Sequence, residues 1–135
     1  MDTRTEKAME IHRKGGNCCQ AVVCAFDDVL NIDFKTLFSI SEGFGLGMGN
    51  MKNTCGAVSG MVMLAGLKNS SGSPQNGITK SATYKIASEM TEEFRNQTGS
   101  VICGEIKGVS TGKCLKSCSQ CIADCVKIAE NKIFG

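Results

Sequence analysis

Four cysteines near the end of this 135-residue chain recur at intervals of four, three and four residues. They are Cys114, Cys118, Cys121 and Cys125, in the segment CLKSCSQCIADC. An α-helix turns about 100° per residue, so this spacing would place all four thiols within about 60° of one another. Thiols in such a stripe are suited to soft-metal binding, to dithiol redox chemistry or to packing as small apolar side chains.

The stripe by itself cannot hold one metal ion. Cys114 and Cys125 would lie about 16 Å apart along such a helix, whereas a Zn–S bond measures about 2.3 Å. At most two neighbouring thiols of the stripe can share an ion or one face of a cluster, so other segments must supply the rest. The candidates are Cys18, Cys19, Cys24, Cys55 and Cys103.

Two of these candidates are predicted to lie in the first turn of a helix. Cys18 follows Asn17 and Cys55 follows Thr54, and Asn and Thr are both cap-forming residue types. The unpaired N–H groups and the dipole at a helix start favour negative charge. We therefore expect both thiols to lose their protons more readily than a free cysteine does.

The other candidate residues have different expected roles. Cys19 and Cys24 point to other faces of their helix and are predicted to be core residues, while Cys103 follows an irregular segment. The CSQC segment at 118–121 is a C-x-x-C pair, but it lacks the βαβ setting of thioredoxin-like proteins. His12 is the only histidine and lies in a charged, exposed helix, so a Cys–His nucleophile pair has no obvious base.

Composition limits the cellular setting. Nine cysteines cannot all pair as disulfides within one chain, and a reducing cytosol opposes a disulfide framework.

The net charge is +2 without a dense Lys/Arg run, so we expect no nucleic-acid partner. The start MDTRTEKAMEIHRK has no signal-peptide core, and the apolar run 57–67 is too short to span a bilayer. We expect a soluble, cytoplasmic protein that does not enter a membrane.

Helical periodicity between glycine-rich breaks predicts an all-α fold. We predict one domain over residues 1–135, a bundle of five or six helices with a Gly-rich loop before the fourth. Asn17 and Asp33 are predicted N-caps, and Gly99 is a predicted helix end. The expected helices cover about 3–14, 18–31, 34–41, 55–68, 78–97 and 113–133.

Glycines flank Cys55 on both sides. The four alternating glycines of residues 43–49 predict a loop in which backbones approach closely. Gly56 and Gly60 are four residues apart and share one helix face, so they let another backbone come near. That backbone belongs either to the same chain or to a second copy in a homodimer.

The order of four segments resembles a known family. These segments are GNCCQAVVCAF, GFGLGMGNMKNTCGAVSGMVMLAGL, ICGEIKG and CSQCIADCVKIAE. Together they resemble the redox-active protein family named for its C_GCAxxG_C_C motif, over about residues 5–130. The most specific part is TCGAVSG, which follows the glycine-rich stretch.

The resemblance implies four functional cysteines and redox chemistry based on electron transfer or an iron–sulfur cluster. By position the four are Cys18, Cys55, Cys103 and one in the last helix, where Cys118 fits best and Cys121 next. This sequence departs from the family name at Thr54, where the name has Gly before Cys. It also carries further thiols at Cys19, Cys24, Cys114, Cys121 and Cys125.

The first functional hypothesis is therefore a redox protein that binds an iron–sulfur cluster through cysteines from several helices. The predicted ligands are Cys18, Cys55, Cys103 and Cys118, with Cys121 as an alternative. Its role would be electron transfer or redox sensing, with a redox partner protein.

Two alternatives stay open from the residues alone. One is a thiol–disulfide oxidoreductase, in which a low-pKa Cys55 or Cys18 attacks a disulfide and Cys103 or Cys118 resolves the mixed disulfide. The other is a zinc or Cu(I) thiolate site. The cysteine pattern does not decide whether the chain is an enzyme.

Overall fold

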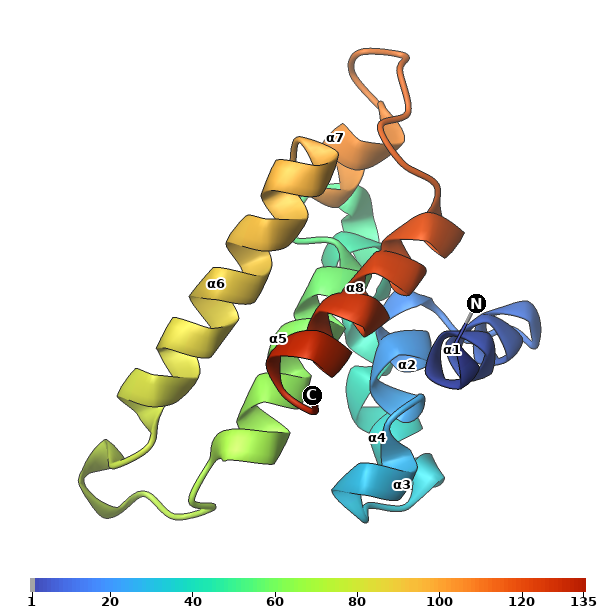
Figure 1. The fold of residues 1–135 in the computed structure, drawn as a ribbon. Coiled ribbons are helices and arrows are strands. Elements are labelled where there is room, and N and C mark those ends of the chain that lie inside the picture. Colours follow the sequence, from blue (N-terminus) through green and yellow to red (C-terminus); the bar gives the residue numbers. More distant parts are fainter. Residues whose placement is uncertain (1) are drawn as a thin grey trace.

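The computed structural model describes residues 2–135, apart from the side chain of Asn76. Over that range the chain forms one all-α domain of eight α-helices without a β-strand (Figure 1). The helices are α1 (Thr3–Arg13), α2 (Cys18–Cys24), α3 (Asp27–Leu30), α4 (Phe34–Ser41), α5 (Gly56–Asn69), α6 (Lys80–Thr98), α7 (Cys103–Lys107) and α8 (Cys118–Lys132). Three short helical turns are η1 (Glu42–Phe44), η2 (Gly47–Met51) and η3 (Gln75–Gly77).

Helix α5 lies at the centre of the bundle. It packs against α2, α6 and α8, while α1 packs on α2 and α8 and α4 packs on α2. Figure 1 shows α6 and α2 on opposite sides of α5, with α7 at the end of the molecule where α6 finishes. Fully buried Met61, Phe94 and Ile122 belong to the main core, and Cys19 and Leu37 to a smaller cluster between α2 and α4.

The predicted helix ends are mostly confirmed. Asn17 caps α2 in a capping box, in which its side chain accepts from the Gln20 N–H and the Gln20 side chain accepts from the Asn17 N–H. Asp33 caps α4 by accepting a bond from the N–H of Thr36. Gly99 ends α6 with a φ of 105°, a conformation that favours glycine.

Gly60 allows α5 and α2 to cross closely, as its spacing from Gly56 predicts. A Cβ atom on Gly60 would lie 3.1 Å from the carbonyl oxygen of Cys19 and 3.2 Å from the Cβ of Val22. The neighbouring backbone thus belongs to the same chain. The close crossing places the start of α2 beside the start of α5.

We expect Gly60→Ala to lower the free energy of unfolding by about 1–3 kcal/mol, because the added methyl group forces α2 away from α5. Gly66→Ala is the matched control in the same helix. No atom lies within 4 Å of a Cβ built there, so the better helix propensity of Ala should stabilise the protein by about 0.5–1 kcal/mol. Urea unfolding of both variants measures the difference, and equal effects would contradict the close crossing.

Two boundaries differ from prediction near the N-terminal end. The predicted helix 18–31 is broken into α2 and α3, so the Gly-rich segment precedes the fifth helix and not the fourth. The break has a physical cause: Arg4 donates a 2.7 Å hydrogen bond to the carbonyl oxygen of Ala25, which a continuous helix would use internally. Phe26 then turns into the core and stacks on Phe134 at 4.7 Å between ring centroids.

The predicted last helix also starts later than expected. Ser117 caps α8 and accepts a hydrogen bond from the N–H of Gln120, so the helix begins at Cys118. The N–H of Leu115 instead donates to the carbonyl oxygen of Ile106, 2.7 Å away. Cys114 therefore lies in an exposed loop, and the predicted four-thiol stripe is wrong in its first member.

One segment predicted to be irregular contains a short helix, since residues 103–107 form α7. The Gly-rich segment has one short helical turn, η1, and is otherwise irregular as predicted, because Met48 and Gly49 within η2 have left-handed, non-helical backbone angles. In the part of the chain that the structure describes, we find no helix with both the length and the apolar character that crossing a membrane requires.

Candidate functional site

Five cysteines line one cavity of about 160 Å³. They are Cys18, Cys55, Cys103, Cys118 and Cys121, the five that the sequence predicts as ligands. They come from α2, α5, α7 and α8, which are widely separated in the chain. The predicted convergence of these thiols is thus present in the structure, while their role as ligands stays a prediction.

Four of the five thiols stand where a helix begins. Cys18, Cys103 and Cys118 are the first residues of α2, α7 and α8. Cys55 is itself the N-cap of α5, so the prediction that Thr54 caps this helix is wrong by one residue. The cavity is therefore surrounded by helix starts, whose free N–H groups favour negative charge.

A short antiparallel pairing brings Cys55 next to Cys103. Thr54 forms a β-bridge with Ile102. On its two sides, the Cys55 N–H donates to the carbonyl oxygen of Val101 at 2.7 Å, and the Cys103 N–H donates to that of Asn53 at 2.9 Å. These backbone bonds join the two segments, so that both thiols line the cavity although they are 48 residues apart in the sequence.

The Gly-rich segment covers another side of the cavity. Gly47 has a φ of +56°, and a Cβ built on it would lie 2.5 Å from the Cβ of Cys103. Leu46, beside it, lines the cavity and has a left-handed φ of 56°. The predicted close approach is confirmed at Gly47, whereas Gly43 and Gly49 have open space around them.

Cys118 forms the more polar of two thiol pairs. Its sulfur lies 3.2 Å from the ammonium nitrogen of Lys107. A hydrogen bond from the Cys18 thiol and the nearby Lys107 charge together lower the pKa of Cys118 to about 5, against the opposing effect of burial. The same contact raises the pKa of Lys107, because its charged form is stabilised. These contacts favour the thiolate form of Cys118.

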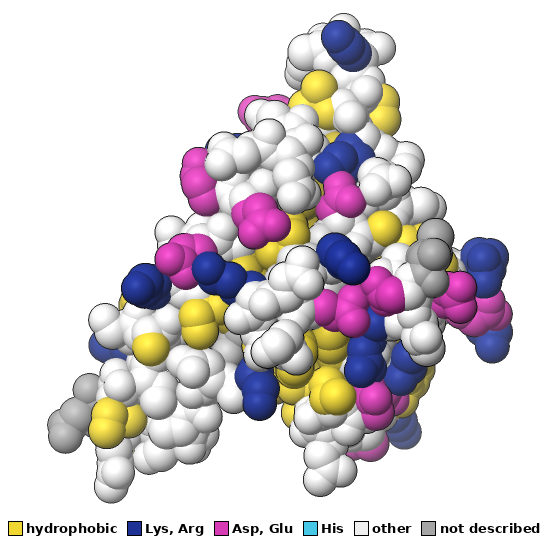
Figure 2. Space-filling model, viewed as in Figure 1, with side chains coloured by type: hydrophobic (Ala, Val, Ile, Leu, Met, Phe, Trp, Pro, Cys, Tyr) yellow, Lys and Arg dark blue, Asp and Glu magenta, His cyan; other side chains and the backbone are white. Residues whose placement is uncertain are grey.

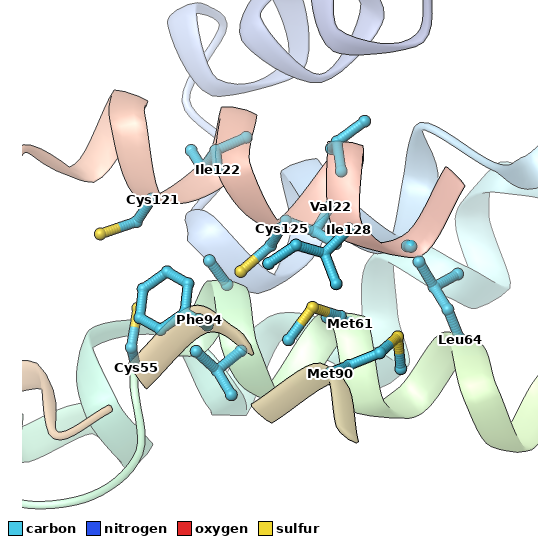
Figure 3. Packing of buried hydrophobic residues seen from close by; sticks show 14 of the residues in the cluster. Val22, Cys55, Met61, Leu64, Met90, Phe94, Cys121, Ile122, Cys125 and Ile128 are labelled. Atoms are coloured by element: carbon cyan, nitrogen blue, oxygen red, sulfur yellow. The ribbon is translucent and has the colours of Figure 1, made fainter. Parts of the chain in front are cut away.

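Cys55 and Cys121 form the second pair, which lies deeper. The Cys121 thiol donates to Cys55, and together with the N–H groups of Ala57 and Val58 it lowers the pKa of Cys55 to about 7. Figure 3 shows Cys55 and Cys121 at one end of the buried cluster, with Cys125 one turn further along α8 near Met61. Cys55 thus has a thiolate-favouring position, as the sequence predicts.

The expectation for Cys18 is wrong. Its thiol donates to Cys118, and this bond and burial raise the pKa of Cys18 far above its usual value. Burial also raises the pKa of Cys103. A helix start alone does not produce a thiolate where a neighbouring sulfur takes the negative charge first.

The remaining four cysteines lie outside the cavity. Cys19 and Cys24 are fully buried, as predicted for core residues, and burial raises their pKa values to about 12 and about 11. Cys125 is also buried, with its pKa raised. Cys114 is exposed in the loop before α8.

Two lysines and the histidine add basic groups to the cavity lining, in which no acidic side chain of the described residues takes part. Lys107 follows Cys103 by four residues on α7, a spacing that could have revealed it. Lys116 also forms an ion pair with Asp124 of α8. His12, which was predicted to be exposed in a charged helix, is half-buried and reaches the cavity from α1.

The thiols surround a space and do not converge on one point. Within residues 2–135, no group of three or more His, Cys, Asp or Glu side chains is close enough to hold a single metal ion. The arrangement suits a larger group with several attachment points, or chemistry between paired thiols.

The sequence from residue 16 to residue 132 matches one family model, described as "Putative redox-active protein (C_GCAxxG_C_C)". The chain belongs to the C_GCAxxG_C_C family. Searches of curated proteins and of solved structures gave no match. The C_GCAxxG_C_C description speaks of redox activity and names neither a cofactor nor a substrate. The matched range includes all five cysteines of the cavity.

Proposed function

We propose that this C_GCAxxG_C_C protein binds an iron–sulfur cluster in the cysteine cavity and uses it in electron transfer or redox sensing. The observation that carries the proposal is the convergence of five thiols from four helices on one cavity. The proposed ligands are Cys18, Cys55, Cys103 and Cys118, with Cys121 as the alternative to Cys118. Nine cysteines in a family described as redox-active support the same chemistry.

The donor set fits such a cluster. All candidate donors that line the cavity, apart from His12, are thiols, which iron–sulfur clusters prefer. Thiolates and sulfides bring excess negative charge, and the adjacent Lys107 and Lys116 compensate part of it. The wall formed by Leu46 and Ile106 is apolar and limits the entry of water.

A single zinc or Cu(I) ion fits less well. With Zn–S bonds of about 2.3 Å, four tetrahedral sulfurs would lie only about 3.8 Å apart. No three ligand-type side chains of the described chain are gathered so closely. A polynuclear cluster takes one thiolate at each of several iron corners, so its ligands surround a larger volume.

In this proposal the cavity residues have different roles in holding the cluster. Cys55 and Cys103 are fixed by backbone hydrogen bonds between their segments and provide a rigid side. Cys118 is held near Lys107, whose ammonium group donates to sulfur and stabilises its negative charge. When bound, an iron–sulfur cluster supplies one-electron redox chemistry at a potential set by such hydrogen bonds and by solvent access.

The test is the composition of protein purified without oxygen. We expect iron and acid-labile sulfide in equal molar amounts, with a visible charge-transfer absorption that bleaches on reduction. Colourless protein that takes up neither element during anaerobic reconstitution would overturn the proposal. Zinc without sulfide would favour the metal-ion alternative.

The two thiol pairs support a second candidate function, thiol–disulfide exchange. The Cys118 thiolate attacks one sulfur of a substrate disulfide RS–SR′, forming a Cys118–SR mixed disulfide as R′S⁻ leaves. Cys18 gives its proton to R′S⁻ and attacks the Cys118 sulfur, releasing RS⁻ and leaving a Cys18–Cys118 disulfide. The substrate disulfide gains two electrons and the two cysteines lose two. The observations that favour this reaction are that Cys18 and Cys118 line the same cavity and that the Lys107 ammonium group, 3.2 Å from the Cys118 sulfur, helps lower the pKa of Cys118.

A further inference from the structure

A second and larger space lies on the other side of α7. It is an open cleft of about 950 Å³ between the η2 turn and the loop 108–117. Gly104, Glu105 and Gly108 face this cleft, whereas Cys103, Ile106 and Lys107 face the thiol cavity. One short helix therefore separates the cleft from the thiols.

The cleft has basic edges and exposed apolar side chains. Lys52 and Lys113 line it from the η2 side and from the loop. Val109 and Leu115, also in its lining, are 62% and 44% exposed. On the face shown in Figure 2, the projecting loop carries basic and hydrophobic side chains. An exposed apolar centre with charged edges is typical of protein-binding surfaces.

The cleft has its own charged residues, apart from those of the thiol cavity. Lys107 and Lys116 of the cavity are paired with Cys118 and Asp124, whereas the cleft is lined by Lys52, Lys113 and one acidic residue. That residue, Glu105, accepts a 2.5 Å hydrogen bond from the hydroxyl of Ser100. The two lysines therefore offer the cleft edges to acidic groups of an approaching partner.

We propose that the cleft docks an acidic electron-carrier protein that exchanges electrons with the cavity across α7. The inference rests on the proposed redox function. A partner in the cleft is separated from Cys103 by the width of one helix, about 10 Å. Gly104 and Gly108 let the η2 turn and the loop pack directly on α7, since Cβ atoms there would lie 2.7 Å from the Met51 carbonyl oxygen and 2.4 Å from the Lys113 backbone. Electrostatic steering suits a carrier that must bind quickly and leave quickly.

The test is an NMR titration of the ¹⁵N-labelled protein with a strongly acidic [2Fe–2S] ferredoxin as the probe. At low salt we expect shifts or broadening confined to residues 50–52 and 99–115, and loss of binding by about tenfold or more at 0.5 M NaCl. The double variant Lys52→Glu and Lys113→Glu should weaken binding by a similar factor.

Lys68→Glu with Lys80→Glu is the matched control. Both lysines are exposed, and they lie at the end of α5 and the start of α6, at the far end of the molecule from α7 (Figure 1). The control makes the same change in net charge and should leave the affinity within about twofold, because the screened field of distant charges is weak. Equal loss in both double variants would overturn the assigned surface, as would absence of binding or perturbation elsewhere.

Two further outcomes separate this inference from others. Shifts in the same residues that grow with protein concentration before the ferredoxin is added would assign the cleft to a second copy of the chain, against the proposal. Iron and sulfide are measured in the same sample. Protein that takes up no iron or sulfide during anaerobic reconstitution and still docks would refute the cluster and keep the surface, whereas failure of iron-loaded protein to dock would refute only the surface.

Discussion

Replacing Cys55 with Ala is expected to lower the iron bound per chain by about tenfold or more, because loss of one of four thiolate ligands leaves an iron corner without its donor. Cys55 is the strongest choice among the cavity thiols. It is 6% exposed, it is held by the backbone bond from its N–H to Val101, and its pKa is already lowered by Cys121 and the start of α5. Iron and sulfide analysis of anaerobically reconstituted protein measures the effect.

Cys24→Ala is the matched control for this substitution. Cys24 is fully buried but belongs to the smaller core cluster and does not line the cavity. Both variants remove one buried sulfur and should lose similar stability by denaturation, about 1–2 kcal/mol. Only Cys55→Ala should lose iron. Equal loss in the two variants would point to general unfolding, and full iron in Cys55→Ala would remove this thiol from the ligand set.

The same measurement distinguishes the two candidates for the fourth ligand. Cys118 is half-buried beside Lys107, whereas Cys121 is 2% exposed and directs its thiol to Cys55. We therefore expect Cys118→Ala to lose iron and Cys121→Ala to retain most of it. The reverse result would make Cys121 the ligand and leave Cys118 as the charge partner of Lys107.

Local signals in the sequence predict much of the fold. The caps at Asn17 and Asp33 and the glycine at 99 are short-range features. As expected, the two caps begin helices and the glycine ends one. The apolar residues that recur every four positions in 78–97 likewise predict α6 to within two residues. Such features succeed because the competing interactions involve only neighbours in the chain.

The failures come from long-range contacts. Arg4 takes the carbonyl oxygen of Ala25 and breaks a helix that local propensity would continue. Leu115 bonds to Ile106 and keeps Cys114 out of α8, although the i, i+4 spacing of the cysteines is ideal for a helix. A single sequence contains no sign of either partner, so the stripe of four thiols was a reasonable but incorrect prediction.

The candidate site is likewise predicted in part by local sequence and in part depends on long-range contacts. The resemblance to the C_GCAxxG_C_C family selects four cysteines, but the residues alone do not show how they meet. Convergence depends on the bridge between Thr54 and Ile102 and on the close crossing at Gly60. The charge partner Lys107 depends on α7, which lies in a segment predicted to be irregular. The electrostatics of the thiols therefore depend on contacts that only the three-dimensional structure shows.

In cluster-free protein, alkylation of Cys118 by iodoacetamide is expected to be nearly constant from pH 6 to pH 9 and to fall only near pH 5. The pKa of Cys118 is lowered to about 5 in the folded protein, so the reactive thiolate is present above that pH and is protonated below it. In the denatured chain the same thiol should titrate at about 8.5. At pH 6 the folded protein thus has a thiolate fraction about three hundredfold larger at this position. Mass spectrometry of Cys118 peptides measures both profiles.

Lys107 provides the control for this profile, because its ammonium group contributes to the lowered pKa without changing the sulfur itself. Lys107→Met should move the midpoint of Cys118 alkylation upward, while Lys107→Arg keeps the charge and should hold it low. A wild-type alkylation midpoint near the ordinary cysteine pKa, or a midpoint that does not change in Lys107→Met, would contradict the contact between Lys107 and Cys118.

The low pKa of Cys118 matters for both candidate functions. A thiolate at neutral pH binds iron without first losing a proton, and it also attacks disulfides. Iron content then decides between the two, since a cluster that occupies the Cys118 sulfur protects it from iodoacetamide, whereas a free dithiol stays open to alkylation.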